Sequence, residues 1–174
     1  MILKVLGIIF IIFSCISIGW IYMEKENERL LLLKEFRKMC MLLKGVVRYS
    51  GQDLVEAIND VSEKLDVRIK EFMNELVLEM KKMDGKLFNS IWKEKVCDKF
   101  NNCSLKEKDK EIIIKTGDIL GYLDKELQIE NFEQYITEFN GIISDLEKEI
   151  AEKNKLYKTL SVGAAIFIVI IFLN

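Results

Sequence analysis

Two long runs without a charged residue lie near the ends of the chain. The first extends from Val5 to Met23 and contains 19 residues, and the second extends from Thr159 to Leu173 and contains 15. A helix rises about 1.5 Å per residue, so the first run spans roughly 28 Å, close to the hydrocarbon core of a bilayer at about 30 Å. The pattern therefore predicts an N-terminal transmembrane anchor over residues 1–23 and a C-terminal transmembrane segment over residues 159–174.

Each run has an alternative interpretation. The first could be a cleaved signal peptide, but no small-residue cleavage site follows it and the helical pattern continues directly from Glu24, which favours an uncleaved anchor. The second is short for a span and could be a buried hydrophobic tail. It reaches a usable length if Leu156 and Tyr157 are included and Lys158 extends back toward the headgroups.

Basic residues flank the inner ends of both runs. Positive charge marks the cytoplasmic side of a membrane segment, so we expect residues 24–158 to form a cytoplasmic domain. The flanking basic residues are Lys25, Arg29, Lys34, Arg37, Lys38, Lys153, Lys155 and Lys158.

Between the two runs, apolar residues recur three and four positions apart, and no segment shows the sustained alternation of a strand. A first helix is expected from Glu24 to about Tyr49. Gly51 suits a left-handed end to that helix, and Asp53 can cap a second helix that carries Leu54 and Ala57. The fold class predicted is all-α, an antiparallel bundle of about six helices flanked by the two transmembrane helices.

Further turn signals divide the rest of the central domain. Asp66 is expected to cap a third helix that ends at Gly85, and a fourth spans Leu87 to about Phe100. Ser104 followed three residues later by Glu107 is a capping-box pattern at the start of a fifth helix.

The last turn predicted lies between residues 120 and 125. Gly121 is expected to end the fifth helix, and Asp124 to cap a sixth in which Gln128 takes a first-turn position. From Ile129 to Leu160 the apolar positions follow a heptad spacing that continues into the C-terminal run. This seam is either a core stripe within the bundle or a surface for pairing between chains.

Composition argues against catalysis and against nucleic acid. The chain has no histidine and a net charge of −2, and we find no phosphate loop, nucleophile motif or acidic cluster at metal-ligand spacing. We therefore expect no enzyme, no cofactor, no metal and no small-molecule substrate. The four cysteines, Cys15, Cys40, Cys97 and Cys103, are expected to be reduced thiols, with a Cys97–Cys103 disulfide as the alternative.

Three stretches resemble the stage III sporulation protein AB family. "LGYLDKELQIENFEQYI" resembles the turn between the last two helices of the family, "YSGQDLVEAI" its early helix junction, and "KLYKTLSVGAAIFIVIIFL" its C-terminus. Ser161 departs from the family pattern, which has Gly after that Leu. The motif residues at the helix junctions are Gly51, Leu54, Ala57, Gly121, Asp124 and Gln128.

The resemblance implies a function that composition does not. It implies a cytoplasmic domain similar to that of type II secretion F-type platform proteins. The chain would be a non-catalytic platform or adaptor in the mother-cell membrane facing the forespore. Its partners would be a sporulation secretion-type ATPase, other subunits of a channel complex and the lipid bilayer. The alternative is a membrane-anchored coiled-coil scaffold outside secretion, which dimerises through residues 129–160.

Overall fold

The structure is a computed structural model that describes residues 2–82, 85–120 and 124–173, with several side chains in the two apolar runs outside this description. Across the described residues every regular element is an α-helix, as the sequence predicts. The chain divides into two units, residues 1–28 with 144–174 and residues 29–143. The helices are α1 (Ile2–Tyr49), α2 (Leu54–Ser62), α3 (Val67–Met80), α4 (Phe88–Lys99), α5 (Glu107–Ile119) and α6 (Lys125–Leu173).

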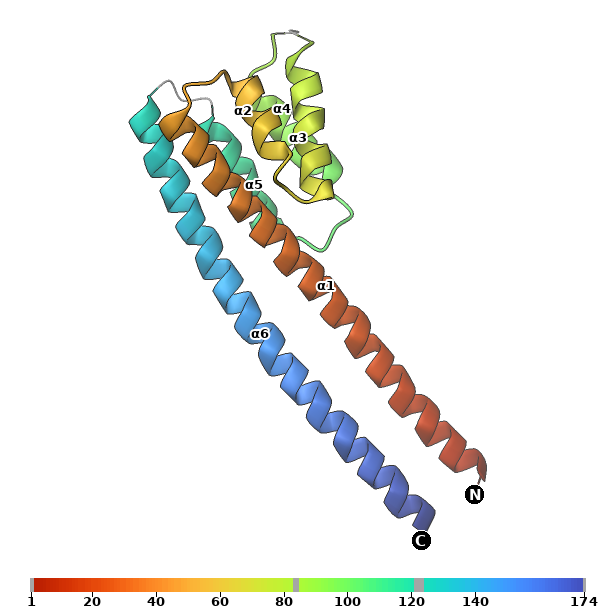
Figure 1. Ribbon diagram of the computed structural model, residues 1–174. Coiled ribbons are helices and arrows are strands. Elements are labelled where there is room, and N and C mark those ends of the chain that lie inside the picture. Colours follow the sequence, from red (N-terminus) through yellow and green to blue (C-terminus); the bar gives the residue numbers. More distant parts are fainter. Residues whose placement is uncertain (1, 83–84, 121–123, 174) are drawn as a thin grey trace. The chain divides into compact units, whose positions relative to one another are not determined.

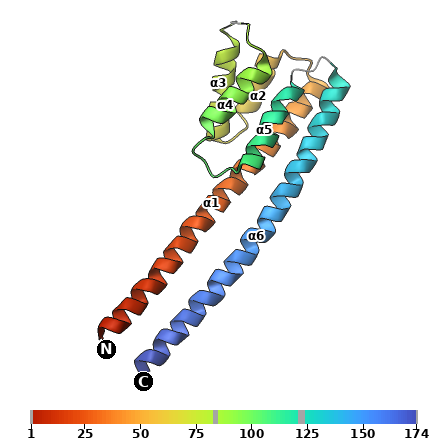
Figure 2. The same cartoon turned by 180° about the vertical axis from the view of Figure 1, so that it is seen from behind.

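Residues 29–143 form the bundle unit. Successive helices run in alternating directions, so that the C-terminal ends of α1, α3 and α5 gather at one end (Figure 1). The α2–α3 and α4–α5 connections lie at the other end, as the view from behind also shows (Figure 2). This is the up-and-down arrangement that short connections favour.

Aromatic rings from three helices fill the centre of the bundle unit. Phe72 on α3 lies 5.1 Å from Trp92 on α4 and 5.4 Å from Phe100, measured between ring centroids. Phe36 on α1 contacts Phe100 at 5.2 Å. All four side chains are fully buried, and their edge-to-face geometry is the one that aromatic quadrupoles prefer.

Trp92 also joins α4 to α5. Its indole N–H donates to the carbonyl oxygen of Ile113 at 2.8 Å, and its ring lies directly against Gly117. A Cβ atom at residue 117 would clash with the indole ring. Gly117 is therefore required by close approach of the ring to the α5 backbone.

The turn chemistry follows the sequence at two of the expected positions. Gly51 has φ +61°, the left-handed conformation predicted for the end of α1. Asp66 caps α3, where its side chain accepts the backbone N–H of Arg68 at 3.1 Å.

Two boundary predictions are wrong. The third helix ends at Met80 rather than at Gly85, although Gly85 has the left-handed φ of +76°. The fifth helix begins at Glu107, and its N-cap is Lys106 rather than Ser104. The reason is that Asp109, in the first turn, accepts the backbone N–H of Lys106 at 2.8 Å, which fixes the start of the helix two residues later.

An ion-pair network on the surface joins α3 to α4. Lys99 Nζ lies 2.8 Å from Glu75 and 3.1 Å from Glu71. Hydrogen bonds from the ammonium group to Glu75 and then Glu71 raise the pKa of Lys99 above its usual range. The pair is partly solvated, so it contributes more to alignment than to stability.

The second unit consists of the N-terminal part of α1 and the C-terminal part of α6, which run antiparallel. Tyr157 packs against Gly19, where an added Cβ atom would lie 2.7 Å from the ring. Lys153 Nζ lies 4.6 Å from the centre of the Tyr22 ring and 2.6 Å from Glu149. The hydrogen bond to Glu149 raises the pKa of Lys153. Among the described residues, no helix combines the length and the apolar character that crossing a membrane requires.

The seam predicted on the sixth helix is part of the core where it crosses the bundle unit. Phe132, Phe139 and Ile143 are buried within the chain. The first half of the heptad pattern is therefore an intramolecular core stripe, one of the two interpretations that the sequence left open.

Candidate docking site at the helix junctions

The turn before α6 is built by Asp124. Its Oδ1 atom accepts the backbone N–H groups of Glu126 at 2.8 Å and Leu127 at 3.2 Å. These are two of the first N–H groups of the helix, which have no partner within it. The capping role predicted for Asp124 is confirmed, whereas Gly121 lies outside the described residues.

Gln128 takes the first-turn position expected for it. Its backbone N–H donates to the carbonyl oxygen of Asp124 at 3.1 Å, and its side chain is partly exposed. The residue thus belongs to the helix start.

The junction between α1 and α2 contains the other motif residues. Gly51 is exposed, Leu54 is half-buried, and Ala57 is buried in the core. Asp53 occupies the N-cap position, but its side chain makes no capping hydrogen bond. Gln52 instead connects the turn to α2, since its side-chain amide donates to Asp60 at 3.0 Å.

The two junctions lie at the same end of the bundle unit (Figure 1). Large apolar side chains are exposed there: Tyr49 is 82% exposed, Leu87 at the start of α4 is 71% exposed, and Leu127 is 42% exposed. We call Tyr49, Leu87 and Leu127 the junction face. The sequence motif residues shape the turns, while these three neighbours supply apolar surface that a partner could cover.

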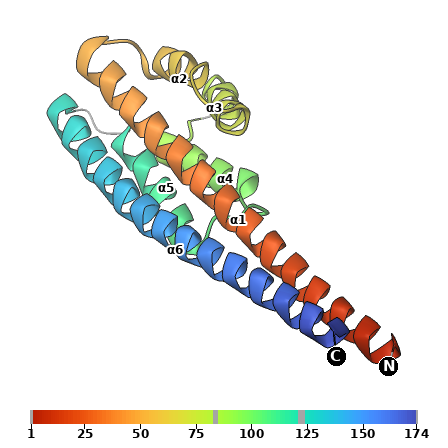
Figure 3. The same cartoon turned by 60° about the horizontal axis from the view of Figure 1, so that its bottom comes forward.

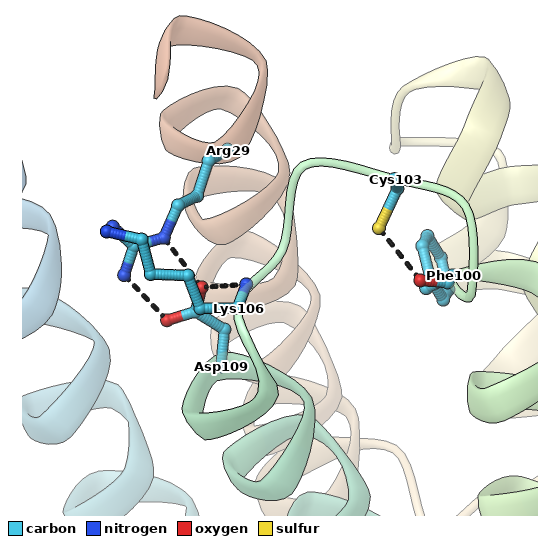
Figure 4. Close-up of polar contacts among 5 residues, drawn as sticks. All are labelled: Arg29, Phe100, Cys103, Lys106 and Asp109. Atoms are coloured by element: carbon cyan, nitrogen blue, oxygen red, sulfur yellow. Dashed lines mark hydrogen bonds and ion pairs between the residues drawn. The ribbon is translucent and has the colours of Figure 1, made fainter. Parts of the chain in front are cut away.

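A buried ion pair joins α1 to α5, although no sequence pattern predicted it. Arg29 holds Asp109 with two hydrogen bonds, Nε to Oδ2 at 2.6 Å and Nη2 to Oδ1 at 2.9 Å (Figure 4). Both residues are buried. Because Oδ2 also accepts the Lys106 N–H, one carboxylate joins the start of α5 to α1.

The only sequence signal for this pair was an acidic residue in the first turn of a helix, a common capping feature. Its basic partner lies 80 residues earlier, so only the packing of α1 against α5 brings the two together. The geometry is structural, because both side chains point into the helix contact and their charges are satisfied there.

Three of the four thiols lie among the side chains that the structure describes. Cys40, Cys97 and Cys103 form no disulfide, so the alternative of a Cys97–Cys103 disulfide is not realised in the structure. Cys103 donates its S–H to the carbonyl oxygen of Phe100 at 3.0 Å (Figure 4). Burial raises the pKa of the Cys40 thiol to about 12, which keeps it protonated and unreactive. Within the described ranges, no cluster of acidic or cysteine side chains could hold a metal ion.

The described residues thus define a helical protein whose distinguishing features are turns, a buried ion pair and exposed apolar side chains. The family model of stage III sporulation protein AB matches residues 4–173, and the chain belongs to that family. The resemblance seen in its sequence is confirmed.

Two similar proteins carry the same description. Stage III sporulation protein AB of Bacillus subtilis (strain 168) is 20% identical over 171 residues, 98% of this chain and 99% of that protein. A solved structure of a stage III sporulation protein AB has a TM-score of 0.64 and 18% identity, and covers 71% of this chain and 97% of that one. That likeness shows a shared fold.

Proposed function

We propose that this chain is a non-catalytic membrane platform subunit of a secretion-like channel between mother cell and forespore, and that it docks a secretion-type ATPase. The observation that carries the proposal is the match to a sporulation family over residues 4–173. The helical bundle supports it, because an adaptor needs a rigid body and exposed faces rather than reactive groups.

Membrane anchoring rests on the two uncharged runs. Residues 5–23 lie on α1 and residues 159–173 on α6. Trp20 and Tyr22, at the inner end of the first run, are exposed, as suits rings at a membrane interface. The uncharged runs, the exposed rings and the basic residues that follow them favour a cytoplasmic bundle unit. They also suit a location in the mother-cell membrane that faces the forespore.

The junction face is the surface that we assign to the ATPase. The three members of the junction face are exposed, although each could bury a large apolar area: Tyr49, Leu87 and Leu127. Burial of such side chains in a partner pocket typically dominates the affinity of an interface.

The first test is deletion of the gene in the source bacterium, followed by starvation and a count of heat-resistant spores. Arrest after engulfment with normal vegetative growth is the expected result. A normal spore yield would exclude an essential role in the channel, and a membrane-anchored scaffold outside secretion would become the leading account.

Docking is tested by co-purification of the ATPase with full-length variants. Tyr49→Ser combined with Leu127→Ser is expected to abolish recovery of the ATPase without unfolding the chain, because both side chains are exposed. Val67→Ser is the matched control, since Val67 is also exposed but follows the α2–α3 connection at the opposite end. Equal recovery from all variants would show that another surface docks the ATPase.

A further inference from the structure

The contacts of the second unit fix which residues of its two helices lie at the same level. There the N-terminal part of α1 and the C-terminal part of α6 lie side by side and run antiparallel (Figure 3). Tyr157 packs against Gly19, and Lys153 lies over the ring of Tyr22. The two contacts are about one helical turn apart on each helix, so together they set the register of α1 against α6.

In this register an uncharged stretch of α1 lies beside a basic stretch of α6. Residues 18–23 of α1 contain no charged side chain, and residues 153–158 of α6 contain three lysines and no acidic residue. We call these two stretches together the lysine layer. The uncharged run of α1 thus extends past the level at which the uncharged run of α6 begins, at Thr159.

Acidic residues are concentrated in the stretches next to the lysine layer, residues 24–28 and 148–152. These contain five acidic residues and two basic ones. One lysine of the layer is already paired, because Lys153 lies 2.6 Å from Glu149. Lys155 is exposed and has no ion-pair partner among the described side chains. Positive charge without an acidic partner is therefore left beside the apolar runs.

If the chain is anchored as proposed above, the lysine layer has two possible depths in the membrane. A hydrocarbon core that extends to Met23 would enclose the layer and bury its ammonium groups in lipid at high cost. A core that ends near Thr159 would place the layer among the lipid headgroups. The rings of the layer favour the headgroup depth, because Trp20, Tyr22 and Tyr157 are of the types that prefer the interface.

The direction of α6 helps its lysines to reach the headgroups. Side chains on a helix tilt toward the N-terminus of that helix, and on α6 this direction leads away from the apolar run. A lysine beside the run therefore extends its ammonium group out of the hydrocarbon and toward the lipid phosphates. Lys155 and Lys158 occupy such positions, about one turn apart.

We propose that the lysine layer binds the phosphate groups of anionic phospholipids through Lys155 and Lys158. The layer contains no carboxylate, so a headgroup with net negative charge is favoured over a zwitterionic one, which carries its own cation. One lysine near an anionic surface typically raises affinity about fivefold, and two raise it tenfold or more. The proposal rests on the membrane anchoring that the proposed function includes.

The test uses the fluorescence of Trp20 in the full-length protein, reconstituted in vesicles of equal parts phosphatidylglycerol and phosphatidylcholine. One of the two lipids carries brominated acyl chains, which quench a nearby tryptophan, and the experiment is repeated with the label exchanged. Brominated phosphatidylglycerol is expected to quench more strongly, by an amount that corresponds to an enrichment of about tenfold around the protein. Trp92, the other tryptophan, is buried in the bundle unit and adds a constant signal.

Variants of the two lysines test whether they cause the enrichment. Lys155→Gln/Lys158→Gln is expected to reduce it to about twofold or less, and Lys155→Arg/Lys158→Arg should keep it because the charge remains. The matched control is Lys64→Gln/Lys108→Gln, which removes two exposed lysines of the bundle unit and should leave the enrichment unchanged. Equal quenching by the two lipids, or a glutamine variant that keeps the preference, would overturn the proposal.

Inorganic phosphate distinguishes a lipid site from a site for a soluble anion. An excess of phosphate should leave the same lipid preference as chloride at equal ionic strength, because screening is then the same. Loss of the preference in phosphate alone would assign the lysines to a soluble anion and reject lipid binding.

The outcome is separable from that of the proposed function. Enrichment of the anionic lipid together with a normal spore yield after gene deletion would uphold lipid binding and reject the channel role. Equal quenching in a chain that resists an alkaline carbonate wash, together with loss of spores, would reject the lipid site and retain the proposed function. A chain that carbonate removes from membranes would reject anchoring and the lipid site together.

Discussion

At the residue scale, the position of Trp92 explains why residue 117 is a glycine. Its indole nitrogen is held by Ile113, so the ring cannot move away from Gly117. The glycine is unfavourable in a helix interior by about 1 kcal/mol relative to alanine. Its presence in α5 is explained by the ring that lies against it.

Gly117→Ala is therefore expected to destabilise the fold by about 1–3 kcal/mol, because the overpacking outweighs the better helix propensity. Gly141→Ala is the control, since an added Cβ atom there meets nothing within 4 Å. That change should stabilise the chain by up to about 1 kcal/mol. Urea denaturation measures both, and a stabilising Gly117→Ala would contradict the packing account.

The buried thiol of Cys40 is expected to make the free energy of unfolding depend on pH. Burial raises the pKa of its thiol to about 12 in the folded chain, whereas an unfolded thiol ionises near about pH 8.5. Above about pH 8.5 the unfolded state loses the proton and the folded state keeps it. The contribution of the buried thiol is thus complete below that pH and decreases as the pH rises toward about 12.

The limiting slope is about 1.4 kcal/mol of unfolding free energy per pH unit. Denaturation at several pH values from about 8 to about 10 measures this slope, and Cys40→Ala should reduce it. If the unmodified chain and Cys40→Ala have the same slope, the Cys40 thiol does not cause the pH dependence.

At the element scale, helix starts depend on whether an acidic side chain reaches the backbone. Asp124 accepts two N–H groups of α6, while Asp53 occupies the same position before α2 without a capping hydrogen bond. Asp124→Ala should cost about 1 kcal/mol of stability and Asp53→Ala distinctly less. Equal losses in thermal denaturation would show that side-chain capping does not distinguish them.

A capping loss alone would also leave partner binding intact. If Asp124→Ala left folding unchanged yet abolished recovery of the ATPase, a direct contact role would replace the capping role.

The contact between α1 and α5 depends on the Arg29–Asp109 pair. Asp109→Ala leaves a buried guanidinium without its carboxylate and is expected to cost about 3–5 kcal/mol. The double variant Arg29→Met/Asp109→Leu should be far closer to the original stability, because it leaves neither charge of the pair buried without its partner. Chemical denaturation of the three chains tests this, and a double variant less stable than Asp109→Ala would refute it.

At the scale of the whole molecule, anchoring by both apolar runs predicts how the chain partitions. The full-length protein should stay in the membrane fraction after an alkaline carbonate wash, since each run gains several kcal/mol on insertion. A chain without residues 1–23 and 159–174 should appear in the supernatant. A full-length protein that is washed off would contradict anchoring.

The sequence by itself determined the helical class, the presence of about six helices in the described part of the chain, the left-handed turn at Gly51 and the caps at Asp66 and Asp124. Periodicity, glycine and capping residues act within a few positions, so their effects are readable locally. The family resemblance also came from sequence, because the order and spacing of three stretches extend over the whole chain.

Only the tertiary structure decided which residues depend on one another across the chain. The packing of α1 against α5 paired Arg29 with Asp109, and the ring of Trp92 made Gly117 necessary. It also assigned the first half of the heptad seam to the core and left the outer faces of α1 and α6 exposed. These outcomes depend on contacts between residues far apart in sequence, which no local pattern specifies.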